Sequence, residues 1–247
     1  MLNGARRGAG DVSALRYSWF SLCNLYQSTP RDKINAWHLV QLPQLDYAAV
    51  IAPLKPGPFV MARGASAVGQ WGMIPASSRT RRPMTTAGNP MSTNNARRET
   101  LASAWTYRFA WSRGQRCLIP CDSFDEPYWG TGKNIWWRFH RADGQPWALA
   151  GIWNEWVDPA TGEAVPNFSM ITQNCDAHPL LSRMHKPDPT LAADRQDKRS
   201  VVPIEAGDWD QWLHGSKEQA EALIGLPELD CIRHAAADPA KQVELQF

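Results

Sequence analysis

Residues 116–174 constrain the fold most, because they hold four short strand-forming segments separated by turns. The segments read RCLIP, NIWWRFH, PWALAGIW and NFSMITQN. RADGQ joins the second to the third, and its Asp143-Gly144 pair is typical of a β-hairpin turn. VDPATGEAVP forms the next turn. Strands that succeed one another through tight turns favour antiparallel pairing, so we expect an α+β fold and not alternating βαβ units.

Helices are expected on either side of this strand-rich middle. Thr29 followed by Pro30 is a typical helix start, which predicts a helix over residues 30–39. The segments RRETLASAWTYRFAWS and EAGDWDQWLHG also read as helical. Ser216 and Gln219 predict a capping box for a helix over KEQAEALIG.

The chain is expected to form one domain, residues 23–247, because no repeat or linker divides it. Residues 1–22 show no apolar period, so we expect a disordered leader that is absent from the mature protein. This leader lacks the apolar centre of a secretory signal, and no apolar run approaches the ~18 residues that cross a bilayer. The five cysteines are irregularly spaced, which argues against a disulfide framework. We therefore expect a cytoplasmic monomer.

Charge is unevenly distributed along a chain whose formal net charge is only +2. The segment 79–116 contains eight arginines and a single acid, Glu99. The arginines are Arg79, Arg81, Arg82, Arg97, Arg98, Arg108, Arg113 and Arg116. Such a concentration of guanidinium groups indicates an anionic partner, with phosphate favoured. The alternative is a solvated arginine-rich loop. Residues 75–95 are a long polar loop, and long loops in compact domains are often functional.

Four motifs occur in order along the chain: CNLYQ, NARRET, RCLIPCDSFDEP and HPLLSRMHKPD. Together with WGMIP, AGIW and SVVPI, they resemble the SOS-response-associated peptidase (SRAP) family, whose members crosslink to abasic sites in single-stranded DNA. The resemblance covers nearly all of residues 22–213. It implies an antiparallel, partly barrel-like β-sheet with flanking helices and a positively charged DNA groove. It also implies that the active cysteine becomes the first residue of the mature chain.

Cys23 matches the crosslinking nucleophile of that family. An abasic deoxyribose opens to an aldehyde, which an α-amine attacks to give an imine. The thiol of the same residue then closes onto the imine carbon, forming a five-membered thiazolidine. The free α-amine has a reference pKa of about 7.7–8.0, so part of it is unprotonated near neutrality. The alternative for Cys23 is a small buried apolar residue.

The resemblance assigns three further catalytic residues. Asn95 would position the cysteine end and the sugar, with a turn asparagine as the alternative. Glu126 would shuttle protons during ring opening and imine formation. His185 would exchange protons with the sugar oxygen or the imine. The sequence leaves open whether Asp125 or Glu126 faces inward, and His178 is a second candidate histidine.

Four residues are candidates for DNA contact. Arg97 matches the motif arginine that binds phosphate, which suits guanidinium geometry. Arg98 has no match in the family, and its alternative is a plain surface charge. Trp71 is expected in the core or in the wall of the groove, with the core preferred. Lys186 is a candidate for phosphate contact.

The chain also departs from the family. Pro127 stands where many members have an aromatic residue, so Tyr128 or Trp129 would have to supply any stacking contact. SSRTRRP replaces the paired tryptophans that many members carry before NAR, which predicts DNA contacts that depend on arginine and steeply on salt. Cys117 and Cys121 have no second Cys/His pair with ligand spacing, so we expect no metal. We also expect no cofactor.

Two other functions remain open at this point. A cysteine peptidase would use Cys23 and His185 as a nucleophile–base pair, cutting its own leader or other chains. A nucleic-acid-binding module would do no covalent chemistry. Leu22 stands where the family has its initiator Met, so either an upstream start assignment or self-cleavage would explain the leader.

Overall fold

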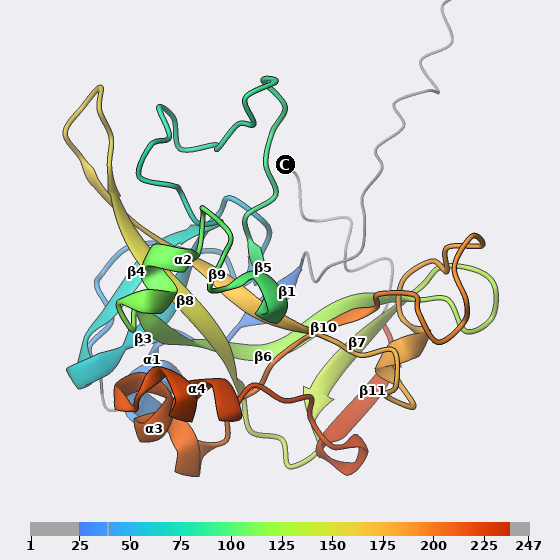
Figure 1. Cartoon of the computed structure of the whole chain (residues 1–247). Coiled ribbons are helices and arrows are strands. Elements are labelled where there is room, and N and C mark those ends of the chain that lie inside the picture. The colour runs from blue at the N-terminus through green and yellow to red at the C-terminus, as the bar shows by residue number, and fades with distance from the viewer. Residues whose placement is uncertain (1–24, 39, 238–247) are drawn as a thin grey trace, which may run out of the picture.

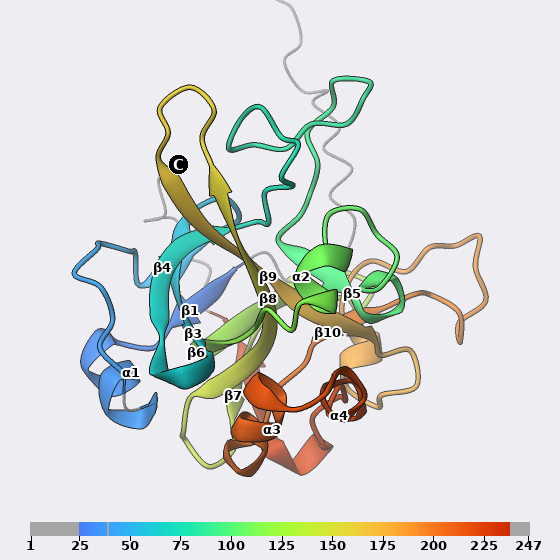
Figure 2. The ribbon, with the colours of Figure 1, turned by 60° about the vertical axis from the view of Figure 1, so that its left-hand side comes forward.

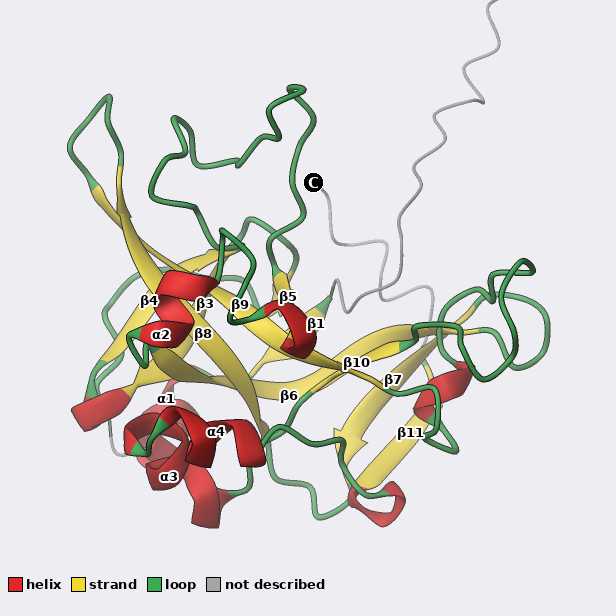
Figure 3. Ribbon diagram, viewed as in Figure 1, coloured by secondary structure: helices red, strands yellow, loops and turns green. Residues whose placement is uncertain are grey.

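The structure is a computed structural model, and it describes residues 25–38 and 40–237. Strands predominate, as Figure 3 shows. The strands in this part of the chain are β1 (Tyr26–Ser28), β2 (Val50–Ile51), β3 (Pro56–Met61), β4 (Ser66–Trp71), β5 (Asn95–Arg97), β6 (Arg116–Tyr128), β7 (Ile135–Arg141), β8 (Trp147–Val157), β9 (Ala164–Asn174), β10 (Arg199–Val201) and β11 (Ile232–Ala236).

The helices are short and lie around the sheet (Figure 1). The α-helices are α1 (Arg31–His38), α2 (Arg108–Ser112), α3 (Trp209–His214) and α4 (Lys217–Ala222). The 3-10 turns are η1 (Ala62–Gly64), η2 (Arg98–Thr100), η3 (Leu181–Arg183), η4 (Ala206–Asp208) and η5 (Leu229–Cys231). Among the described helices, none is both long and apolar enough to cross a membrane.

Five strands close into a barrel in the order β3, β4, β9, β8 and β6, with β6 returning to β3. This confirms the α+β fold with a partly barrel-like sheet. The sheet is mixed, however, because both β4 and β5 run parallel to β9. The hairpin of β8 and β9 rises well beyond the barrel in Figures 1 and 2.

The predicted hairpin of residues 134–153 is wrong in its pairing. The turn forms, since Gly144 N–H donates to Arg141 O at 3.2 Å and Gly144 has φ 77°. The flanking strands β7 and β8 pair with β6, however: β8 with its first half and β7 with its second. The reason is the length of β6, which extends far beyond the RCLIP segment and offers a pairing edge to both strands in succession.

Strand alternation divides the apolar side chains of the first half of β6 between two cores. In β6, Cys117 and Ile119 point into one core, which also contains Trp71, whereas Leu118 points into the other. The second core lies against the helices and includes the buried Trp212 of α3. The barrel is therefore packed on both faces of β6.

Three helix predictions were accurate and one was too long. The helix predicted over residues 205–215 is η4 followed by α3. The helix predicted over 30–39 is α1, and the Ser216–Gln219 capping box is present at α4. The helix predicted over 97–112 is interrupted: η2 and α2 are separated by a turn-rich segment around Trp105. That segment packs Leu101 and Tyr107 into the core, and this packing overrides local helix propensity.

Candidate active site

A β-bulge in β6 decides which side chains face the first core. Strand β1 pairs Gln27 with Ser123 but Ser28 with Cys121, so Asp122 is an extra residue in β6. A bulge of this kind reverses the alternation of every side chain after it. Cys121 faces the first core before the bulge, and Phe124 faces that core after it.

The bulge places Glu126 and Asp125 on opposite faces. Glu126 lies between Phe124 and Tyr128 on the face of the first core, and only 2% of its surface is exposed. Asp125 accepts two hydrogen bonds of 2.8 Å from the Arg138 guanidinium across the neighbouring strand. Glu126 is therefore the inward carboxylate that the sequence left undecided, and Asp125 forms a structural ion pair.

Glu126 faces His185 inside the protein. Nε2 of His185 lies 3.0 Å from Oε2 of Glu126, and His185 is 4% exposed. The contact lacks the alignment of a hydrogen bond, and within the described residues neither Glu126 oxygen nor His185 Nε2 has another partner. Buried polar atoms left in this state cost about 1–3 kcal/mol each, so such a pair indicates a place for a reacting group.

The backbone of His185 is in a conformation that non-glycine residues rarely adopt, with φ 60°. Two contacts hold it there. Its backbone N–H donates to Pro127 O at 2.6 Å, next to Glu126, and the Lys198 ammonium donates to its carbonyl at 2.7 Å. Strained backbone that the surroundings hold in place is typical of active sites.

Lys198 is a site residue that no sequence motif identified. It is 4% exposed, and its Nζ also donates to Lys186 O at 3.0 Å. Burial lowers its pKa below 10.5. The carboxylate of Asp176 accepts hydrogen bonds from the backbone N–H groups of Asp197 and Lys198, at 2.9 and 2.8 Å, which fixes the segment that carries the ammonium.

A buried thiol lies close to the pair. Burial, followed by the negative charge of Glu126, raises the pKa of Cys175 above its ordinary 9.0. The thiol therefore stays protonated at neutral pH and is a poor nucleophile. Burial likewise raises the pKa values of Cys117 and Cys121, which are both free and fully buried.

Cys23 lies outside the described residues. The first described residue, Leu25, is hydrogen-bonded through its carbonyl to the Asp125 N–H at 3.2 Å. The described chain thus begins beside the strand position adjacent to Glu126.

Asn95 lies on β5 and is 5% exposed. Its backbone is fixed on two sides, by the parallel pairing of Asn95 with Met170 and by the Tyr107 hydroxyl, which donates to Asn95 O at 2.9 Å. The alternative of a turn asparagine is wrong, since Asn95 is the first residue of a strand.

His178 has a structural role instead of a chemical one. Its Nδ1 accepts from the N–H groups of Leu180 and Leu181 at 3.2 and 3.1 Å. Its Nε2 lies 3.0 Å from Pro227 O, which requires the proton on Nε2. Both ring nitrogens are therefore occupied, and His185 is the histidine that faces the carboxylate.

The arginines of the NARRET motif differ in availability. Arg97 is 47% exposed at its side chain and pairs with Asp197 at 2.8 Å. Arg98 is half-buried and donates to Gln173 Oε1 and Ile224 O, at 3.1 and 3.2 Å, so it ties two segments together. Arg97 is thus the more accessible of the two cations.

The two other DNA candidates occupy different environments. Trp71 is 0% exposed and donates from Nε1 to Asn94 O at 2.9 Å, which favours the core alternative and offers no surface to DNA. Lys186 is exposed, and its Nζ lies 5.8 Å from the centre of the Trp129 ring. Tyr128 stacks on Trp137, with 3.9 Å between ring centroids.

The fold and the site together define a class: a single-domain α+β barrel protein with a buried carboxylate–imidazole pair suited to acid–base chemistry. The chain matches the family model described as SOS response associated peptidase (SRAP) over residues 23–237. It belongs to this family.

Three solved structures share the fold of this chain. A protein from Bordetella bronchiseptica is similar at 30% identity and a TM-score of 0.77, covering 87% of this chain and 100% of the other. A protein from Bacteroides thetaiotaomicron shares the fold at 19% identity and a TM-score of 0.70, covering 90% and 94%. A phage-related protein from Bordetella bronchiseptica shares the fold at 19% identity and a TM-score of 0.56, covering 87% of this chain and 93% of the other. No curated protein matches the chain.

Proposed function

We propose that the protein binds single-stranded DNA and forms a covalent crosslink with abasic sites through Cys23. The observation that carries the proposal is the buried Glu126–His185 pair, whose polar atoms have no aligned partner within the described residues. A site of this kind suits proton transfers at a small carbonyl compound. The family to which the chain belongs supports a role in the response to DNA damage.

The reaction requires proton transfers at the sugar oxygen, at the amine nitrogen and at the thiol. The α-amine of Cys23 attacks the aldehyde carbon of the opened sugar, and the resulting carbinolamine loses water to give an imine. The thiol then adds across the imine, so that sulfur bonds to carbon and the thiol proton passes to nitrogen. Glu126 protonates the departing oxygen, and His185 relays protons at the sugar oxygen.

Chain geometry is compatible with this assignment. The carbonyl of Leu25 accepts a hydrogen bond from the N–H of Asp125, which is next to Glu126. Cys23 precedes Leu25 by two residues, and two residues of chain span at most about 7 Å. The mechanism therefore requires no remote segment to bring Cys23 to the pair. It does require a free α-amine, so residues 1–22 must be absent from the active protein.

Arg97 is proposed to bind a phosphate of the bound strand. Its guanidinium is exposed and already pairs with the carboxylate of Asp197, whose geometry resembles that of a phosphate. A phosphate group can exchange with Asp197 at little cost, because an exposed ion pair contributes only about 0.2–1 kcal/mol.

A thiol peptidase is the second candidate, and the same pair favours it. A carboxylate beside an imidazole is the arrangement that orients a histidine base toward a thiol nucleophile. This reaction would use the Cys23 thiol with His185 and Glu126, and it works with Cys23 inside the chain. The crosslinking reaction does not.

The test is incubation of protein that begins at Cys23 with a single-stranded oligonucleotide carrying one abasic site. The expected result is a heat-stable shifted band on a denaturing gel, absent for Cys23→Ala and for the chain that keeps residues 1–22. If the extended chain crosslinks equally well, the free amine is not required and the thiazolidine proposal fails. Cleavage of the leader without a shifted band would favour the peptidase.

A further inference from the structure

An exposed aromatic cluster lies at the start of α2 and in the turn before it. Trp105 and Phe109 are 56% and 47% exposed, and among the exposed large apolar residues of the described chain they are the only aromatic ones. Their rings meet edge to face at 5.7 Å. The Arg108 guanidinium lies 4.5 Å from the Trp105 ring centre and 4.7 Å from that of Phe109.

The cluster is ordered before any partner arrives. Nε1 of Trp105 donates to Ser77 Oγ at 3.4 Å, and Arg108 fills the angle between the two rings. Nε of Arg108 is buried without a hydrogen-bond partner within the described residues. An ordered ring loses little conformational freedom when a ligand stacks on it, so the arrangement favours binding.

The position of the cluster connects it to the candidate active site. Tyr107, two residues after Trp105, donates its hydroxyl hydrogen bond to the backbone of Asn95. Ser77 belongs to the arginine-rich loop 75–95, which Figures 1 and 2 show above α2. Arg79 and Arg82 of this loop are exposed. The aromatic cluster thus contacts the loop that carries these cations, and Tyr107, which lies within the same stretch of chain, contacts Asn95.

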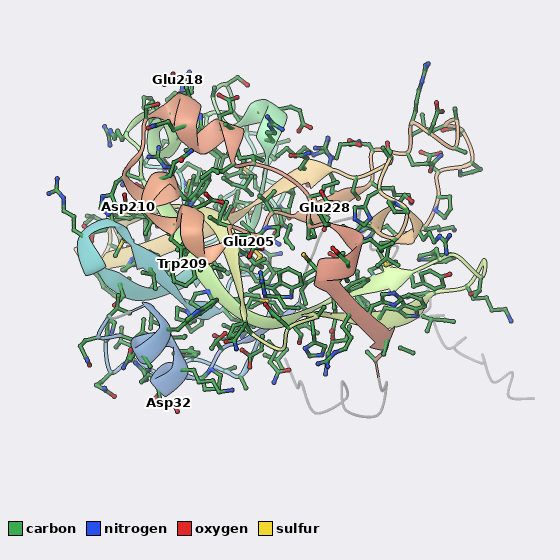
Figure 4. The ribbon with its side chains drawn as sticks, turned by 90° about the horizontal axis from the view of Figure 1, so that it is seen from below. Asp32, Glu205, Trp209, Asp210, Glu218 and Glu228 are labelled. Atoms are coloured by element: carbon green, nitrogen blue, oxygen red, sulfur yellow. The ribbon has the colours of Figure 1, made fainter. Side chains whose placement is uncertain are left out.

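The positive charge of the arginines near the cluster favours a negatively charged partner. Exposed acids lie on the side of the molecule that Figure 4 shows from below. The exposed acids labelled there are Asp32, Glu205, Asp210, Glu218 and Glu228. Exposed rings beside arginines match a ligand that combines flat π surfaces with negative charge, and single-stranded nucleic acid has both.

We propose that Trp105, Arg108 and Phe109 form a stacking platform for an unpaired base of the DNA strand that enters the Glu126–His185 site. This inference rests on the proposed function. The base stacks on the exposed indole, and Arg108 adds a cation next to the adjoining phosphate. The platform supplies affinity that is independent of sequence, because every base presents a π face.

The experiment measures binding without crosslinking, so that the two proposals can fail separately. Fluorescence anisotropy of the full chain is recorded with labelled oligodeoxythymidylate and with an equally long oligomer of tetrahydrofuran abasic analogues. Neither oligomer offers an aldehyde. Trp105→Leu retains apolar area but loses the π surface, whereas Trp105→Phe retains a ring. Leu229→Ala, at an exposed apolar residue outside the cluster, is the matched control.

Trp105→Leu is expected to weaken oligodeoxythymidylate binding by about fivefold or more, the lower end of the range for losing one base–aromatic stack. Binding to the base-free oligomer and the dependence on salt should not change, since no charge is removed. Trp105→Phe should recover most of the affinity, and Leu229→Ala should bind like the wild type.

Equal losses for both oligomers, or no loss for either, would overturn the platform while leaving single-strand binding intact. Wild-type protein that binds neither oligomer would overturn the platform and the DNA-binding proposal together. The remaining alternative is that the cluster is a contact between two copies of the chain. Light scattering of the wild type and of Trp105→Leu measures the oligomeric state and tests this alternative. A shift from dimer to monomer would show that the cluster joins two copies of the chain, and this result would also contradict the platform.

Discussion

Asp125 and Glu126 are consecutive buried carboxylates on the two faces of β6, and they differ in their hydrogen-bond partners. Asp125 forms two aligned hydrogen bonds with Arg138, so its charge is satisfied. Glu126 has His185 at 3.0 Å but no aligned hydrogen bond within the described residues. The comparison teaches that burial alone does not identify a reactive group. The face of β6 that we propose for chemistry carries Glu126, which lacks aligned hydrogen-bond partners within the described residues. The face that carries Asp125 stabilises the fold through the ion pair with Arg138.

The largest expected effect is the loss of acid–base chemistry in Glu126→Gln. This substitution keeps the shape of the side chain but removes its proton-transfer capacity, so crosslink formation should slow by about 100-fold or more. Gel-based rates from pH 5 to 8 measure the effect. A variant that reacts at the wild-type rate throughout this range would remove Glu126 from the mechanism and the contrast with Asp125 would disappear.

Asp125→Asn should act on stability instead. It leaves the partly buried Arg138 guanidinium without its carboxylate, and we expect the free energy of unfolding to fall by about 2 kcal/mol. This value is below that of a fully buried pair, because the Arg138 side chain is 30% exposed. Urea unfolding measures the loss. If Asp125→Asn slowed crosslinking of folded protein as much as Glu126→Gln, the two faces would not be functionally distinct.

Lys198→Met tests whether the hydrogen bond from the Lys198 ammonium to the His185 carbonyl keeps His185 in its position. The substitution leaves the carbonyls of His185 and Lys186 without their donor, so the strained backbone at His185 should relax. We expect crosslinking to slow by about tenfold and its pH profile to change, as follows from displacement of a catalytic group. Lys198→Arg keeps a donor and should recover part of the rate. A slower rate with an unchanged pH profile would indicate a merely structural role.

Arg97→Ala should have a smaller effect, confined to DNA binding. Affinity for an intact single strand should fall severalfold, and the slope of log K against log salt should flatten by about 0.7, the value for one phosphate contact on a single strand. Asp197→Asn releases Arg97 from its ion pair and should change affinity in the opposite direction. Anisotropy titrations at several salt concentrations measure both, and an unaltered slope in Arg97→Ala would exclude this phosphate contact.

The last prediction is that the Cys175 thiol is not alkylated in the folded protein. Its raised pKa means that the neutral thiol persists to higher pH than usual, and only the thiolate is alkylated readily. Iodoacetamide at pH 8 should therefore modify Cys23 in folded protein and leave Cys175 intact. Peptide mass mapping checks this result. Rapid labelling of Cys175 would mean that the interior next to Glu126 is open to solvent.

The sequence identified residues of the candidate site but not how they are arranged. Motif resemblance assigned Glu126 and His185 separately as candidate catalytic residues, and the structure shows that they face each other at 3.0 Å. It left the choice between Asp125 and Glu126 open, because the extra residue Asp122 that reverses the alternation is apparent only from the pairing with β1. Local patterns do not report a register that a distant strand imposes.

Other features were beyond sequence reasoning for related reasons. Lys198 belongs to none of the motifs, and its role arises from backbone carbonyls that tertiary folding brings to it. The turn at Asp143-Gly144 was predicted correctly, but the predicted pairing of its two strands with each other was wrong, because β6 is long enough to pair with both. Turn chemistry fixes where the chain reverses, whereas pairing depends on which edges are available.

The central claim is that the Glu126 face of β6 serves a covalent reaction of an N-terminal Cys23 with an abasic site. Intact-mass spectrometry of protein that begins at Cys23, after incubation with an abasic single-stranded oligonucleotide, tests it most directly. The account predicts a species whose mass equals protein plus oligonucleotide minus one water, and its absence for Cys23→Ala. Unmodified protein and unmodified oligonucleotide under these conditions would contradict the account.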